Sequence, residues 1–302
     1  MGVTEKPREG ERSRSVNKFG VHALVWAGSW EAAKCEYAVA STKEAGYDLI
    51  ELPAFEPSAM DIGAIAKALE ANELEVACSL GLGFDNDINS EDPDSVARGE
   101  ATLDEALSML RDLGGSYLGG VVFSALGPYD HLPTPKSRAN SQAVIGRLAE
   151  KAKASGITVG LEFVNRYETN LLNTAAQTVE YIKEVGSDNL VVHLDSYHMN
   201  IEENNFRDPV FDAGELLGYV HIGENHRGYL GQGHVNFPEL FKALVDAEYD
   251  GVITFESFSS KVVDPNLTTT LRIWRDMWDN SMDLAVQARR YMGEEMAKAG
   301  AK

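Results

Sequence analysis

The sequence predicts a protein of the α/β class, built as a single (β/α)₈ barrel (TIM barrel) over residues 19–302 with a C-terminal helical extension. From residue 19 onward, short β-rich runs alternate with amphipathic helical patterns. The β-rich runs recur roughly every 30 to 40 residues, the spacing of a strand followed by a helix. No linker or composition shift divides residues 19 to 290, and 302 residues with 44% hydrophobic content can bury one large core.

The candidate strands follow one another along the chain. The first four are FGVHALVW (19–26), YDLIELP (47–53), LEVACSLGL (74–82) and YLGGVVFSAL (117–126). The next four are TVGLEFV (158–164), LVVHLDSYH (190–198), YVHIGE (219–224) and GVITFESFS (251–259). Glycines precede several of these runs, as expected where a helix ends and turns into a parallel strand.

The helical patterns between the strands have readable ends. NTAAQTVEYIKEVG (173–186) is expected to begin with Asn173 or Thr174 as its N-cap and to stop at Gly186. The run WRDMWDNSMDLAVQARRYM (274–292) is expected to continue as a final helix, with Trp274 and Trp278 one turn apart. The competing fold is a doubly wound nucleotide-binding sheet, but the turn after the first strand reads WAGSWEAA (26–33), without the glycine pattern.

Charge and composition indicate which binding partners and which cellular compartment suit the protein. The formal net charge is −20, which argues against nucleic acid or an anionic membrane surface. Cys35 and Cys78 lie far apart, and no apolar run reaches membrane-spanning length, so a reducing, cytoplasmic setting is expected. Residues 1–18 contain no apolar signal segment, and we interpret them as a disordered charged N-terminal arm.

Polar residues interrupt the last turns of four consecutive strands. They are Glu162, Asp195, His221 and Glu256, each among apolar neighbours. An unpaired charge in such a place costs several kcal/mol. Since barrel active sites form at the carboxyl ends of the strands, these side chains are expected to converge.

Three carboxylates and one imidazole at one point form a divalent-cation site. An oxygen-rich set suits Mn²⁺, Co²⁺ or Mg²⁺ better than a structural zinc ion. Any one of the four alone could equally be a buried, hydrogen-bonded core residue, and it is their combination that favours a metal. His193 lies two residues before Asp195 and is expected to be a hydrogen-bonded core histidine one layer deeper. His198 lies where the sixth strand opens into its loop and is expected to face the site.

Four runs of the chain resemble the ketose 3-epimerase family, the D-tagatose, D-allulose (psicose) and L-ribulose 3-epimerases, within the sugar isomerase and epimerase barrels. These runs are LEFVNRYETNLLNTAAQ (161–177), HLDSYHMNIEE (193–203), YVHIGENHRGYLGQG (219–233) and ITFESFSS (253–260). The resemblance covers nearly the whole chain from residue 19. It implies a homodimer or homotetramer and one divalent ion per subunit, with Mn²⁺ favoured.

The resemblance also implies roles for individual residues. The metal ligands would be Glu162, Asp195, His221 and Glu256, with the two glutamates as the catalytic acids and bases. The residues that hold the substrate would be Glu168, His198 and Arg227, and Trp26 and His22 from the first strand are candidates for contact with its distal carbons. The chain departs from the family at His22, where an aromatic residue is frequent, and after the fourth strand, where FSALGPYDH (123–131) lacks a tryptophan. Both places concern sugar preference.

Inversion at C3 of a free ketose requires a proton to leave one face and return to the other. Two glutamates flanking C3 could do this through a cis-enediolate whose charge the metal ion stabilises. An aldose–ketose isomerase of the hydroxypyruvate isomerase type could use a similar site and is the alternative function. A metal-dependent abasic-site endonuclease would need more histidines and a basic face. A non-catalytic sugar-binding barrel would be expected to have lost one of the ligands.

Overall fold

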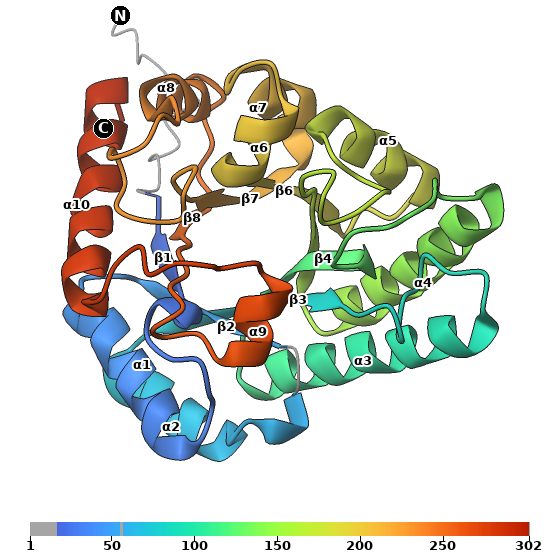
Figure 1. Cartoon of the computed structure of the whole chain (residues 1–302), viewed down its shortest axis with the longest axis horizontal. Coiled ribbons are helices and arrows are strands. Elements are labelled where there is room, and N and C mark those ends of the chain that lie inside the picture. The colour runs from blue at the N-terminus through green and yellow to red at the C-terminus, as the bar shows by residue number, and fades with distance from the viewer. Residues whose placement is uncertain (1–16, 55–56, 302) are drawn as a thin grey trace, which may run out of the picture.

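The computed structural model describes residues 17–54 and 57–301 and contains a closed barrel of parallel strands in the order β1 to β8 (Figure 1). The barrel closes where Val21 of the first strand lies opposite Phe255 of the last. The predicted fold is therefore confirmed, and a doubly wound sheet is excluded because such a sheet stays open. The strands are β1 (Phe19–His22), β2 (Leu49–Pro53), β3 (Glu75–Leu82), β4 (Tyr117–Ala125), β5 (Thr158–Glu162), β6 (Leu190–Asp195), β7 (Leu217–Ile222) and β8 (Val252–Phe255).

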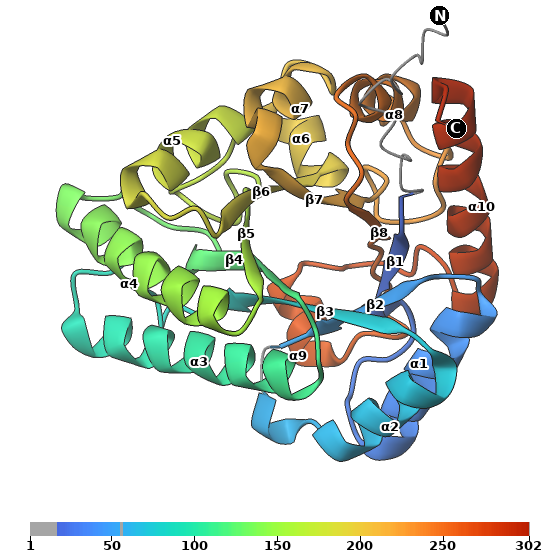
Figure 2. The same ribbon diagram turned by 180° about the vertical axis from the view of Figure 1, so that it is seen from behind.

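Helices form a ring around the barrel, as Figures 1 and 2 show from its two ends. Helix α5 begins after Thr174, whose side chain accepts a hydrogen bond from the backbone of Gln177, and ends at Gly186 with φ +76°, as the sequence predicted. The helices are α1 (Ala32–Glu44), α2 (Ile62–Asn72), α3 (Pro93–Asp112), α4 (Pro135–Ala154), α5 (Ala175–Val185), α6 (Ser196–Glu202), α7 (Asp208–Ala213), α8 (Phe237–Asp246), α9 (Pro265–Thr270) and α10 (Ser281–Ala299).

The barrel interior is filled in layers. Tyr117 and Tyr219 stack with their ring centroids 4.0 Å apart and form a floor together with Leu49 and Ala77. Because side chains alternate along a strand, His221 projects into the barrel two residues above Tyr219, toward the carboxyl ends of the strands. The floor therefore closes the barrel below the site and leaves its upper end for polar side chains.

The chain after β8 covers this upper end. Helix α9 lies in front of the strands in Figure 1 and behind them in Figure 2. The final helix was predicted over residues 274–292, but the structure starts it later. Residues 271–280 are irregular, and α10 begins at Ser281, with Asn280 as its N-cap. Trp274 and Trp278 therefore lie in this irregular segment and not one turn apart on a helix. Trp278 is buried and donates its indole N–H to Ser257, whereas Trp274 is exposed.

Most of the charged N-terminal segment predicted as an arm, residues 1–16, lies outside the described residues. The next residue, Asn17, donates hydrogen bonds to the backbone carbonyls of Tyr249 and Gly251. Among the helices that the structure describes, none is both long and apolar enough to cross a membrane.

Candidate metal centre

Four ligand groups meet at the carboxyl ends of consecutive strands. Glu162 ends β5, Asp195 ends β6, His221 lies near the end of β7, and Glu256 directly follows β8. Each offers one atom, and these atoms all lie within 4.8 Å of one another. All four side chains are buried. The structure thus brings together the residues that the sequence singled out.

His221 is held from behind by a residue that the sequence analysis missed. The Nε2 atom of His221 lies 2.9 and 3.0 Å from the two carboxylate oxygens of Glu51, which extends from β2 and is fully buried. Tyr219 also donates its hydroxyl to Glu51, at 2.8 Å. With Nε2 engaged in this way, the other ring nitrogen, Nδ1, faces the carboxylates of the site.

Two buried atoms of the four ligand residues have no hydrogen-bond partner among the described residues. They are Nδ1 of His221 and Oδ2 of Asp195. The Nδ1 atom lies 3.5 Å from Glu162 and 3.7 Å from Glu256, too far for good hydrogen bonds. A bound cation would satisfy both atoms, and three carboxylates with one imidazole are ligands that Mn²⁺, Co²⁺ or Mg²⁺ accepts. The residues present therefore fit a divalent metal ion.

Arg227 closes one side of the centre. Its Nη1 atom lies 3.0 Å from Asp195 Oδ2 and 2.8 Å from Glu256 Oε2. The guanidinium also lies over the ring of Tyr197, 4.1 Å from its centroid. The residue adopts φ +57°, which is uncommon outside glycine. This fixed cation offsets part of the negative charge of the carboxylates.

Burial and neighbouring charges move the pKa values of these groups in opposite directions. Burial raises the pKa of Glu162 well above its usual range, although His221 acts against this. Burial also acts to raise the pKa of Glu51, but His221 outweighs it and the pKa falls. For His221, burial acts to lower the pKa, but Glu51 and the other carboxylates raise it well above its usual value. The metal-free centre therefore favours an imidazolium on His221.

His198 and Glu168 are joined through Asn165, which the sequence analysis also missed. The backbone and side-chain nitrogens of Asn165 lie 3.2 and 2.9 Å from His198 Nδ1, so this nitrogen accepts and the proton is assigned to Nε2. The side chain of Asn165 also donates to Glu168, at 2.8 Å. Burial lowers the pKa of His198 to about 3 and raises that of Glu168. His198 is thus a neutral donor, with Nε2 lying 3.8 Å from Glu162 and from Asp195.

A cavity of about 60 Å³ opens beside the centre. Its walls include Glu162, Glu256, Glu168, His198, Arg227 and His22. His22 lies 3.9 Å from Glu256 and 3.4 Å from the hydroxyl of Ser79. Burial lowers the pKa of His22 to about 4, so the ring is neutral at pH 7. Trp26 is buried but is not among the residues that line this cavity.

The prediction for His193 was partly wrong. The side chain is fully buried below the centre, as expected, but neither ring nitrogen has a hydrogen-bond partner among the described residues. Its ring instead packs edge-on against His221, with the ring centroids 4.1 Å apart. Burial lowers its pKa well below the usual value, and the neutral ring needs no counter-charge. His193 could also form a smaller ligand group with Glu162 and His221.

Comparison with known proteins places this chain in a family. The model of the xylose isomerase-like TIM barrel family matches residues 39–285. A ketose 3-epimerase of Arthrobacter globiformis is 46% identical over 279 residues, which is 92% of this chain and 96% of the relative. The chain belongs to the ketose 3-epimerase family. The resemblance seen in the sequence is thereby confirmed.

Comparisons with a Methylomonas sequence and with a Methylomonas crystal structure agree with this placement. The L-ribulose 3-epimerase of Methylomonas sp. strain DH-1 is 47% identical over 91% of this chain and 96% of its own length. The crystal structure of a Methylomonas D-allulose 3-epimerase in complex with D-allulose has a TM-score of 0.91 at 46% identity, covering 93% of this chain and 98% of that one. The protein is therefore an enzyme of the ketose 3-epimerase type.

Proposed function

We propose that the enzyme inverts C3 of free, non-phosphorylated ketoses such as L-ribulose, D-allulose or D-fructose, and D-tagatose, with Glu162 and Glu256 as the two proton-transferring groups. The observation that carries the proposal is the entry of two buried carboxylates into one cavity from β5 and β8, three strand positions apart around the barrel. Epimerisation needs one such group on each face of C3. The names of the relatives, which include L-ribulose and D-psicose 3-epimerases, agree with this substrate class.

One divalent ion per subunit, with Mn²⁺ favoured, would be held by Glu162, Asp195, His221 and Glu256. When bound, it would supply Lewis-acid polarisation of the substrate carbonyl next to C3. The surrounding residues keep the four ligands in place. Glu51 fixes the ring of His221, and the other carboxylate oxygen of Asp195, Oδ1, accepts a hydrogen bond from the backbone of Tyr197 at 2.7 Å.

The proton transfers are assigned to the two glutamates. Glu162 lines the cavity and needs only one of its two carboxylate oxygens to hold the metal ion, so the other oxygen can accept a proton from carbon. Glu256 faces the same cavity with one oxygen against Arg227, and it would return a proton to the opposite face. In the reverse direction the two roles exchange. Both carboxylates are buried, so protons reach and leave C3 through these two side chains rather than directly through bulk water.

Negative charge develops on the substrate oxygens when C3 loses its proton. His198 presents its Nε2–H toward the centre, and Arg227 presents its guanidinium from the neighbouring wall. Both would donate hydrogen bonds to the O1 and O2 end of the ketose, where they stabilise this charge. Glu168 lines the same wall and would orient a substrate hydroxyl. We also assign His22, which lines the cavity, to substrate positioning, whereas the role expected for Trp26 rests on the resemblance alone.

We further propose that the enzyme works in the reducing cytoplasm as a homodimer or homotetramer. Both cysteines, Cys35 and Cys78, are buried and unpaired, which suits a reducing compartment. The apolar residues near the C-terminal extension, including the exposed Trp274, offer a surface for subunit contact.

The deciding experiment compares metal-loaded and chelator-treated enzyme on D-fructose, D-tagatose and L-ribulose, with products identified by chromatography. A metal-dependent C3 epimer from at least one ketose is expected. Exchange of the C3 proton with deuterium in heavy water should accompany it. If the enzyme instead forms an aldose and exchanges a proton at C1, it is an aldose–ketose isomerase of the hydroxypyruvate isomerase type.

A further inference from the structure

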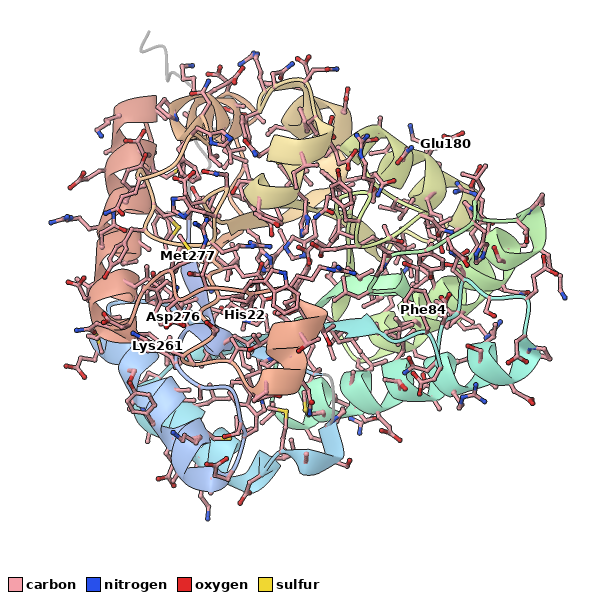
Figure 3. All side chains as sticks on the ribbon, in the orientation of Figure 1. His22, Phe84, Glu180, Lys261, Asp276 and Met277 are labelled. Atoms are coloured by element: carbon pink, nitrogen blue, oxygen red, sulfur yellow. The ribbon has the colours of Figure 1, made fainter. Side chains whose placement is uncertain are left out.

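A second cavity lies directly outside the first. It has a volume of about 260 Å³ and shares Glu168, Arg227, Phe258 and Leu271 with the inner cavity. Its remaining wall comes from Tyr197 of α6, the loop after β7 and the irregular segment that precedes α10. Figure 3 labels Asp276 and Met277 on this segment, which crosses the same end of the barrel as α9. We refer to this second cavity as the outer pocket.

The outer pocket contains two arginines without partners. Among the residues that the structure describes, Arg272 and Arg275 are the arginines whose guanidinium groups form no hydrogen bond or ion pair, and both line this pocket. Every other described arginine has such a partner: Arg98, Arg111, Arg138, Arg147, Arg166, Arg207, Arg227, Arg289 and Arg290. Both side chains are exposed, and with Arg227 they give the lining of this pocket three arginines against one acidic residue, Glu168.

A third donor faces the same space. His226 also lines the outer pocket, and its Nδ1 accepts a hydrogen bond from the backbone of Gly228 at 3.0 Å. The ring proton is therefore assigned to Nε2, which remains free to donate. Arg272 also acts on Glu168, which lies in the wall that the two cavities share. Burial raises the pKa of Glu168, and the positive charge of Arg272 acts to lower it.

We propose that the outer pocket binds a phosphate monoester on O1 of the ketose, so that the enzyme also accepts ketose 1-phosphates. Guanidinium groups match the oxygens of a phosphate with paired hydrogen bonds. The position follows from the proposed function, on which this inference rests: Arg227 and His198 receive the O1 and O2 end of the ketose, and Arg227 forms part of the wall between the cavities. A group attached to O1 therefore points outward, whereas a group at the other end does not.

Binding to metal-free enzyme tests the subsite without relying on catalysis. Calorimetry at low ionic strength would compare D-fructose, D-fructose 1-phosphate, D-fructose 6-phosphate and inorganic phosphate, since exposed charges are screened by salt. The 1-phosphate should bind at least about tenfold more tightly than D-fructose and than the 6-phosphate, as expected for charge-assisted contacts. Inorganic phosphate should compete with the 1-phosphate.

The variant Arg272→Gln/Arg275→Gln should lose this preference and keep its kcat/KM on D-fructose within about twofold, because neither arginine lines the inner cavity. The control is Arg111→Gln, an exposed arginine at the end of α3 that leads into β4, at the opposite face of the barrel. It should behave like the unmodified enzyme.

Equal binding of the 1-phosphate and the 6-phosphate would overturn the proposal, as would a preference that survives in the double variant. If inorganic phosphate binds but the 1-phosphate binds no more tightly than D-fructose, the pocket does not recognise a phosphate attached to the ketose, and the proposal also fails. If no ketose gives a C3 epimer but the 1-phosphate still binds through the two arginines, the proposed reaction fails and the subsite stands.

Discussion

The two halves of the barrel have different tasks. Strands β5 to β8 supply all four candidate metal ligands, whereas β1 to β4 supply none of them. The first half contributes Glu51, which holds His221 from across the barrel, and small residues such as Gly81 and Gly120 that line the cavity. In the proposed mechanism, the residues from β5 to β8 carry out the chemistry, and those from β1 to β4 fix its geometry and leave room for the substrate.

The largest effect on activity is expected for the two glutamates to which the proton transfers are assigned. Replacing Glu162 or Glu256 by Gln keeps the shape of the side chain but removes proton transfer, which is worth about 10²- to 10⁴-fold in rate. We expect kcat on the preferred ketose to fall by at least that range in each variant. Circular dichroism would establish that the variants are folded. Retention of C3 proton exchange at the unmodified rate in both would contradict the assignment.

Residues from β1 to β4 should affect activity through the affinity for the metal ion. Glu51→Gln removes the charge behind His221 and is expected to weaken metal binding by about 10- to 100-fold, as loss of the partner behind a histidine ligand typically does. Titration of metal into chelator-treated protein measures this directly. Tyr219→Phe is the matched control, because it removes the other hydrogen bond to Glu51 and keeps the contact with His221. Equal metal affinity in Glu51→Gln and the unmodified enzyme would show that Glu51 does not support metal binding.

Small residues in the first half can be tested by stability. Gly120 adopts φ +99°, and an added Cβ would lie 2.3 Å from the carbonyl oxygen of Leu80. Gly120→Ala should lower the free energy of unfolding by about 2 kcal/mol or more, because backbone strain and a clash with backbone combine. Gly156→Ala is the control: it shares a positive φ of +69° but has nothing within 4 Å, so a cost of about 1 kcal/mol is expected. Denaturant titrations would compare the two, and equal losses would contradict the crowding at Gly120.

The smallest effect concerns pH and links the two halves. Glu51 and the other carboxylates raise the pKa of His221 in the metal-free site, so a proton occupies the imidazole that a metal must bind. Metal binding should therefore release a proton, and affinity should rise with pH by up to about tenfold per unit while His221 remains protonated. Titrations at pH 6, 7 and 8 measure the slope. In Glu51→Gln the slope should be smaller, and an identical slope would argue against this linkage.

Much of the fold and the ligand set could be predicted because both depend on local patterns. Each of Glu162, Asp195, His221 and Glu256 interrupts an apolar strand near its end, and a barrel brings strand ends together. Glu51 gives a similar signal within LIELP, but its partner is His221, 170 residues away and across the barrel. Nothing near Glu51 in the sequence indicates that contact, which depends on closure of the barrel and on the direction of the side chain.

The final helix and His193 show two other limits. Trp274 and Trp278 have helical spacing, yet Trp278 is fixed by a hydrogen bond to Ser257, and the helix begins only after Asn280. A tertiary contact thus outweighed the local pattern. His193 was expected to have a hydrogen-bond partner because buried polar groups usually do. Its neighbours are instead aromatic rings and a carboxylate 3.9 Å away.

The side chain of Asp195 has two separate attachments. One oxygen, Oδ1, serves as the N-cap of α6, and the other, Oδ2, lies at the centre of the site, 3.0 Å from Arg227 Nη1. A substitution there harms a helix start and a metal ligand at the same time, so its effects on folding and on turnover will not be separable in a mutational scan. Tolerance to substitution at this position should consequently be among the lowest in the chain. A second-site change that restores the helix start would recover protein abundance without recovering turnover.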